Sequence, residues 1–150
     1  MDEPYYHFDL PVTETRYDFI SISQEKEVRK RVMFTTLSNR QVCNLALVDV
    51  LADGTVSDII ETRNKDMTTV LATVIRIIAN FLSDNASKIV LFRGSDERRQ
   101  RLYRLIISRD LIKIQKEFNI FGGMKKSKAE PFKPNKDYDY FIILKNQQIK

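Results

Sequence analysis

The first sixty residues alternate between apolar and polar positions with a period of two, which is typical of β-strands with one buried face. The pattern is clearest in residues 28–37, where the apolar Val28, Val32 and Phe34 alternate with polar residues. Turn residues such as Asp53-Gly54 separate the apolar runs, so consecutive strands are predicted to pair as an antiparallel meander. The predicted strands are Tyr5–Leu10, Tyr17–Ser23, Val28–Leu37, Val42–Leu51 and Val56–Ile60.

From Met67 the period changes to the three-and-four spacing of a helix that packs on a core. Asn64 or Asp66 can cap this helix at its start, and Ser83-Asp84-Asn85 ends it. The apolar positions are Met67, Val70, Leu71, Val74, Ile75, Ile78, Phe81 and Leu82.

The remaining chain predicts a second strand–helix unit and a closing pair of strands. An interior strand at Lys88–Phe92 turns at Gly94-Ser95 into a helix over roughly Asp96–Ser108, and the segment 110–116 has a less defined pattern. Strands follow at Phe118–Phe121 and Tyr138–Leu144, on either side of a basic loop. We therefore predict one α+β domain over residues 1–150, in which an N-terminal antiparallel meander is followed by helix, strand, helix and a strand pair. Its two main helices should pack on one mixed or antiparallel sheet.

Composition removes several classes of chemistry. Cys43, the only cysteine, lies in an apolar run, where a buried inert thiol is expected rather than a reactive one. His7 is the only histidine, so neither a histidine metal cluster nor a proton-relay pair can form. We expect no catalytic constellation, no metal and no cofactor. The N-terminus lacks the basic and apolar regions of a signal peptide, and a cytoplasmic location is expected.

Charge is distributed unevenly along the chain. Residues 1–85 carry 9 Lys and Arg against 13 Asp and Glu, whereas residues 86–150 carry 16 against 7. This excess favours a phosphate-bearing partner, because phosphate attracts Lys and Arg over long range. A solvated, solubilising surface is the alternative.

One turn in the basic half is a candidate anion site. Arg93-Gly94-Ser95 lies between a strand and a helix N-terminus, where free N–H groups and the helix dipole favour an anion. Three arginines of the helix fall on one arc of about 120°, and Tyr103 falls on the opposite, apolar arc. Arg99 also projects into the apolar arc, where it either pairs with a carboxylate at the edge of the core or reaches past Gly94 to a phosphate. The three arginines are Arg98, Arg101 and Arg104.

The basic loop beyond Gly123 is the second candidate. Its lysines alternate with Phe132 and Tyr138, so the loop could follow a nucleic-acid strand by charge and base stacking. An exposed lysine-rich loop without a ligand is the alternative. The candidate lysines are Lys125, Lys126 and Lys128.

The order of the later elements is similar to the later part of GNAT-type acetyltransferases. Those enzymes hold the coenzyme A pyrophosphate on a loop with the pattern Arg/Gln-x-x-Gly-x-Gly/Ala. The stretch here is Arg63-Asn64-Lys65-Asp66-Met67-Thr68, in which Asp66 takes the place of the first glycine. Its carboxylate and its Cβ would both oppose a pyrophosphate. The resemblance therefore implies a similar order of elements and, at most, a degenerate acyltransferase.

A second resemblance rests on more specific motifs. Gly94-Ser95-x-x-x-Arg99-x-Arg101-Leu102-Tyr103 is the most specific, with Asp66-x-x-x-Val70 before it and Phe118-x-Ile120-x-Gly122 after it. With these motifs the chain resembles a family of small uncharacterised bacterial proteins, known as a domain of unknown function. The resemblance implies a bacterial origin and a single domain. It directs attention to Asp66, Thr73, Gly94, Ser95, Arg99, Arg101 and Tyr103, and a salt bridge between Asp66 and Arg99 is the structural alternative for those two.

The function expected from the sequence is a binding or interaction module rather than an enzyme. Its expected target is a phosphate-bearing ligand or nucleic acid, bound through the basic half. The alternatives are the degenerate acyltransferase and a protein–protein interaction partner without catalysis. The primary site candidates are Arg93, Gly94, Ser95, Arg98, Arg99, Arg101 and Tyr103, and the secondary ones are Asp66, Thr73, Lys125, Lys126 and Lys128.

Overall fold

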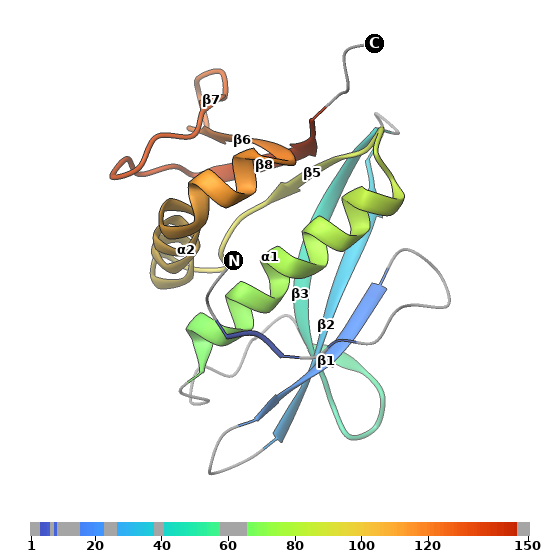
Figure 1. The fold of residues 1–150 in the computed structure, drawn as a ribbon. Coiled ribbons are helices and arrows are strands. Elements are labelled where there is room, and N and C mark those ends of the chain that lie inside the picture. The colour runs from blue at the N-terminus through green and yellow to red at the C-terminus, as the bar shows by residue number, and fades with distance from the viewer. Residues whose placement is uncertain are drawn as a thin grey trace.

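The alternating N-terminal half folds into the predicted β-meander (Figure 1). The computed structural model describes residues 4–6, 8, 16–22, 27–37, 41–57 and 66–146. Consecutive strands pair antiparallel, with Tyr17 opposite Val32 and Phe34 opposite Leu45. The strands are β1 (Arg16–Ile22), β2 (Glu27–Thr36), β3 (Val42–Val50) and the short β4 (Val56–Ser57).

The strand predicted at Tyr5–Leu10 is not confirmed, and part of the strand predicted at Val56–Ile60 cannot be compared with the structure. Where the segment Tyr5–Leu10 is described, Phe8 forms only an isolated bridge with Phe19, and residues 4–6 are not a strand. His7, Arg63-Asn64-Lys65 and the end of the strand predicted at Val56–Ile60 lie outside the described residues.

The second half supplies both helices and completes the sheet. The strand order is β1-β2-β3-β5-β8-β6-β7, with β4 paired to β3. The sheet is mixed, because β3 and β5 run parallel whereas the other described pairs are antiparallel. The elements are α1 (Met67–Asp84), β5 (Ile89–Phe92), α2 (Glu97–Gln115), β6 (Phe118–Gly123), β7 (Glu130–Pro131) and β8 (Tyr140–Lys145).

Both helices cover the same face of the sheet and contact each other (Figure 1). Phe34 of β2 stacks on Phe81 of α1, with 3.9 Å between ring centroids. On the same face, Phe92 of β5 meets Tyr103 of α2 edge to face at 5.3 Å. The α+β prediction is confirmed.

The first helix is the core helix of the domain. By length and composition α1 could cross a membrane, but ten of its 18 residues are buried against the sheet and α2. The Asp66 side chain does not cap α1 and instead accepts a hydrogen bond from the Ser21 hydroxyl at 2.6 Å.

The second helix is longer than predicted. It continues without a break to Gln115, because Ile106, Ile107 and Ile114 extend one buried stripe. Asp110, a buried residue on the same stripe, is what obscured the pattern in the sequence.

Two ion pairs join neighbouring strands. Lys30 and Asp49, directly opposite each other on β2 and β3, are both buried and lie 2.7 Å apart. On the other face, Arg31 binds Asp18 of β1 with both ends of its guanidinium, through Nε at 2.7 Å and Nη2 at 3.0 Å. This hydrogen bonding lowers the pKa of Asp18.

The Asp18–Arg31 pair predicts a pH-dependent stability. Since the folded-state pKa of Asp18 is depressed, the pair stabilises the fold above the unfolded pKa of about 4, and the benefit is lost as the pH falls through the folded value. Asp18→Asn should reduce the free energy of unfolding by roughly 1 kcal/mol at pH 7, and by progressively less below pH ~4. Urea denaturation across this pH range measures the difference. Asp84→Asn, at an exposed position ending α1, is the control; equal loss in both variants would contradict the assignment.

Candidate anion-binding cleft

The turn between β5 and α2 is closed by the side chain of Gln100. Its Oε1 accepts the backbone N–H of Gly94 at 2.6 Å, and its Nε2 donates to the carbonyl oxygen of Tyr138 at 2.8 Å. Gly94 lies so close to α2 that a Cβ there would be 2.3 Å from the Gln100 nitrogen. Gln100 therefore holds the start of α2 against the end of β5 and against the chain leading to β8. It was not among the candidates from the sequence.

Groups of the chain itself occupy the N-terminus of α2. Asp96 caps the helix by accepting the Arg99 N–H at 2.8 Å, and its other oxygen accepts from Arg99 Nη1 at 2.5 Å. The same Nη1 donates to the Ser95 hydroxyl at 3.0 Å. The backbone N–H groups of the predicted anion turn are therefore bonded to the carboxylate of Asp96 and to the side-chain amide of Gln100.

Arg99 and Tyr103 face the core rather than solvent. The Arg99 side chain is only 7% exposed and lies beside Asp96. The predicted Asp66–Arg99 salt bridge is wrong, because Asp66 instead contacts the hydroxyls of Tyr6 and Ser21. Burial raises the pKa of Tyr103, so its phenol stays neutral.

An open cleft lies between the N-terminal half of α2 and the segment 124–139, and we call it the α2 cleft. Its volume is about 680 Å³. It brings together five of the candidate site residues, which are Arg93, Gly94, Ser95, Arg101 and Lys125, and adds Arg104 from the predicted arginine arc.

The α2 cleft is lined by equal numbers of cationic and acidic side chains, but only some of the cations form ion pairs with these acids. Its cations are Arg93, Arg101, Arg104 and Lys125, and its acids are Asp96, Glu97, Asp137 and Asp139. Arg104 pairs with Asp137, and Asp96 is used by Arg99. Asp139 accepts the backbone N–H of Lys125 at 2.8 Å. Among the described residues, Arg93, Arg101 and the Lys125 ammonium have no ion-pair partner.

A smaller cleft of about 240 Å³ lies beside β3, and we call it the β3–β5 cleft. It borders the part of β3 that continues past the end of β5, and it shares Arg93, Gly94 and Ser95 with the α2 cleft. Arg99 and Tyr103 form another part of its lining.

The aromatic residues of the basic loop do not offer a stacking surface. Phe132 and Tyr138 are 5% and 4% exposed and pack against Phe141. The prediction that they could stack on bases is therefore wrong, because they form the core beneath the loop. Lys126 and Lys128 are exposed and do not line the α2 cleft.

Three further candidates lie outside the α2 cleft. Arg98 is exposed on α2. Thr73 is fully buried on α1, where its hydroxyl donates to the Thr69 carbonyl and accepts the backbone N–H of Tyr6, both at 2.8 Å. Asp66 and Thr73 therefore anchor the N-terminal segment.

These features define a class: an α+β domain with both helices on one face of a mixed sheet and arginine-lined clefts beside the second helix. The chain belongs to a family of unknown function, DUF6934, whose profile matches residues 2–146. The family resemblance inferred from the sequence is thereby confirmed. The chain matches no curated protein and no solved structure.

The close approach at Gly94 gives a stability prediction. In Gly94→Ala the new Cβ would overlap the backbone of Gln100, so helix and turn must separate. We expect a loss of about 2 kcal/mol in the free energy of unfolding, as is typical of overpacking.

Chemical denaturation measures this loss, and Ser95→Ala is the neighbouring control. That variant loses one part-buried hydrogen bond, worth about 1 kcal/mol. Wild-type stability in Gly94→Ala would refute the packing described for this turn.

Proposed function

We propose that this protein binds a small phosphate-bearing ligand in the α2 cleft and acts as a binding module rather than an enzyme. One observation carries the proposal. Arg93, Arg101 and Lys125 come from three separate segments, line one cleft and have no ion-pair partner among the described residues. Arginine presents a planar fork of donors that matches phosphate oxygens, and lysine adds a point charge. The cleft volume of about 680 Å³ is within the range of small-molecule sites.

Two features favour a small ligand over a nucleic-acid strand. The aromatic residues that would stack on bases are buried under the loop. The acids that line the cleft also balance its cations in number, which weakens the long-range attraction on which binding to a polyanion depends. Local contacts to one or two phosphate groups then account best for the unpaired cations.

The β3–β5 cleft favours a second candidate, a degenerate acyltransferase. The supporting observation is the parallel pair β3–β5, at whose carboxyl end the cleft opens. Ligands of open α/β sheets bind outside the carboxyl ends of parallel strands. At about 240 Å³ this cleft is the smaller of the two.

A thermal-shift titration with pyrophosphate and ATP tests the first candidate. Both should raise the melting temperature, because a ligand that binds only the native state stabilises it. Arg101→Ala should weaken binding at least about tenfold, since a hydrogen bond to a charged group contributes roughly 1.5–3 kcal/mol. Arg98→Ala removes a neighbouring exposed arginine of α2 outside the cleft and should leave the affinity unchanged.

The same titration distinguishes the alternatives. Absence of any shift with millimolar pyrophosphate and ATP would overturn the proposal, as would equal weakening in Arg98→Ala. Salt-sensitive binding of a single-stranded oligonucleotide without binding of ATP would replace it with a nucleic-acid function. A shift with acetyl-coenzyme A alone, unaffected by Arg101→Ala, would favour the acyltransferase.

A further inference from the structure

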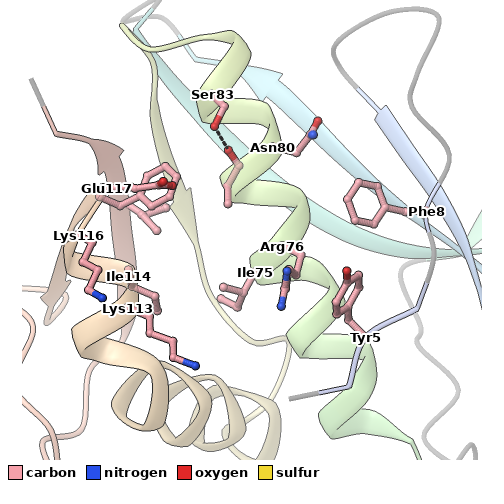
Figure 2. A pocket seen from close by; sticks show the side chains of 13 residues that line it. Tyr5, Phe8, Ile75, Arg76, Asn80, Ser83, Lys113, Ile114, Lys116 and Glu117 are labelled. Carbon is pink, nitrogen blue, oxygen red and sulfur yellow. Dashed lines mark hydrogen bonds between the residues drawn. The ribbon is translucent and has the colours of Figure 1, made fainter. Parts of the chain in front are cut away.

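The face of the sheet opposite the helices carries no helix in the described part of the chain (Figure 1). Successive side chains of a strand point to opposite faces of its sheet. On β5 and β8, Val90 and Ile143 point to the helices and are 0% and 1% exposed. Ile143 lines a cleft on that side together with Ile75 of α1 (Figure 2). The neighbours of Val90 and Ile143 along each strand therefore point to the uncovered face.

Those neighbours form one apolar patch, which we call the outer sheet patch. The strand register places Ile89 beside Leu144 and Leu91 beside Ile142. One further apolar side chain adjoins this block on each side, from β3 and from β6. All six side chains are partly exposed. The members of the outer sheet patch are Val42, Ile89, Leu91, Phe121, Ile142 and Leu144.

The composition of this face is that of an interface rather than of a solvated surface. Strands that are apolar on both faces, as β5 and β8 are, are typical of sheets covered on both sides. The outward positions of β5, β6 and β8 hold no charged residue, and polar side chains stand at two edges of the patch, Asn44 beside Leu91 and Asn119 beside Leu144. A centre without charge and a polar rim are characteristic of protein–protein interfaces.

The distribution of charge favours a second copy of this chain as the occupant of the patch. The chain has a formal net charge of +5, and the cations of α2 lie on the helix side of the sheet. Two copies that met through their helix sides would bring like charges together, which opposes association. Through the outer sheet patch they would meet without facing charges. A strongly charged partner would find no opposite charge there.

The four central side chains are arranged in a way that suits a two-fold axis. Ile89 and Ile142 occupy one diagonal of the block, and Leu91 and Leu144 occupy the other. A second copy rotated by a half-turn about an axis between the two sheets and parallel to β5 places each isoleucine opposite a leucine. Side chains on two facing sheets can then interdigitate in the same way throughout the block.

The apolar surface also extends beyond the block. Met33 of β2 and Ala46 of β3 are an opposing pair on the same face, and both are partly exposed. They enlarge the surface toward the size of about 800 Å² per partner that a stable dimer buries. A few central side chains supply most of the free energy of such an interface.

We propose that two copies of this chain form a symmetric dimer in which their outer sheet patches pack face to face. The two sheets then lie about 10 Å apart, as in other packed sheets. Both helix layers lie on the outside of this dimer. The inference does not depend on the proposed function of the α2 cleft.

Sedimentation equilibrium of the full chain, from low micromolar to millimolar concentration, tests the proposal. The expected result is a reversible dimer that persists at high salt, because salt screens charge attraction and does not weaken the burial of apolar surface. A monomer at every concentration would overturn the proposal, as would a dimer that dissociates when salt is added.

Two variants locate the interface. Leu91→Glu should raise the dissociation constant of the dimer at least about a hundredfold, because it buries a charge without a partner. Ile112→Glu makes the same kind of change at a 78% exposed position of α2 and should leave the constant unchanged. Leu91→Thr combined with Ile142→Thr should raise it about tenfold or more and keeps side chains that strands accommodate, so it is the second variant if Leu91→Glu fails to fold. Unchanged association of the folded double variant, or equal loss in Ile112→Glu, would refute the interface.

A measurement on the unaltered sequence is independent of these variants. The δ1 methyl signals of isoleucine are recorded with a soluble gadolinium chelate at low and at high protein concentration. Ile89 and Ile142 should become protected from broadening as the dimer forms, whereas the exposed Ile112 should broaden equally at both concentrations. Protection of Ile112 in place of Ile89 and Ile142 would put the contact on the helix side and contradict the proposal.

Discussion

The hydrogen bonds of Gln100 determine where α2 begins relative to the sheet. One side-chain amide accepts from Gly94 at the end of β5 and donates to Tyr138 before β8. Part-buried backbone groups need such partners, so the three segments are tied to one another by a single residue. Arg93 and Arg101 flank this junction, and both line the α2 cleft.

The arrangement of both helices on one sheet face explains why clefts form at either end of α2. Its centre is packed on the core through Tyr103, Ile106 and Ile107. Near its start, the segment 124–139 forms the opposite wall of the α2 cleft. Near its end, α1 and the side chains of Tyr5 and Phe8 line a separate cleft of about 460 Å³. The two clefts differ in chemistry accordingly. Among the described residues, the cleft at the start of α2 is lined by charged side chains of both signs, whereas the cleft at its end has core side chains such as Ile75 and Ile143 at its base.

Much of the fold could be predicted from the sequence, because alternation and helical spacing are local signals. The buried face of β2 with Val32 and Phe34, and the buried stripe of α1, follow directly from these periods. The continuous length of α2 did not, because Asp110 is buried within an otherwise apolar stripe. The burial of Lys30 was not predicted either, and its pairing with Asp49 across the strands explains it.

The candidate site was predicted in part, and the limit has a physical cause. The turn chemistry and the helical wheel identified Arg93, Gly94 and Arg101, which the structure brings to one cleft together with Lys125. Gln100 was missed because no local sequence pattern shows that its side chain hydrogen-bonds to Gly94 and to the distant Tyr138. Arg99 was singled out correctly as anomalous for an apolar arc, and its position beside Asp96 and Ser95 shows that it is held by the helix cap.

The proposed phosphate site depends on Arg93, Arg101 and Lys125, which have no ion-pair partner among the described residues of the α2 cleft. The most direct measurement is a titration of the ¹⁵N-labelled protein with pyrophosphate, followed by backbone amide chemical shifts. If these cations bind phosphate, saturable shifts should be confined to residues 93–104 and 124–139, with residues 113–118 unchanged. Shifts concentrated away from those two segments, or none at millimolar pyrophosphate, would contradict it.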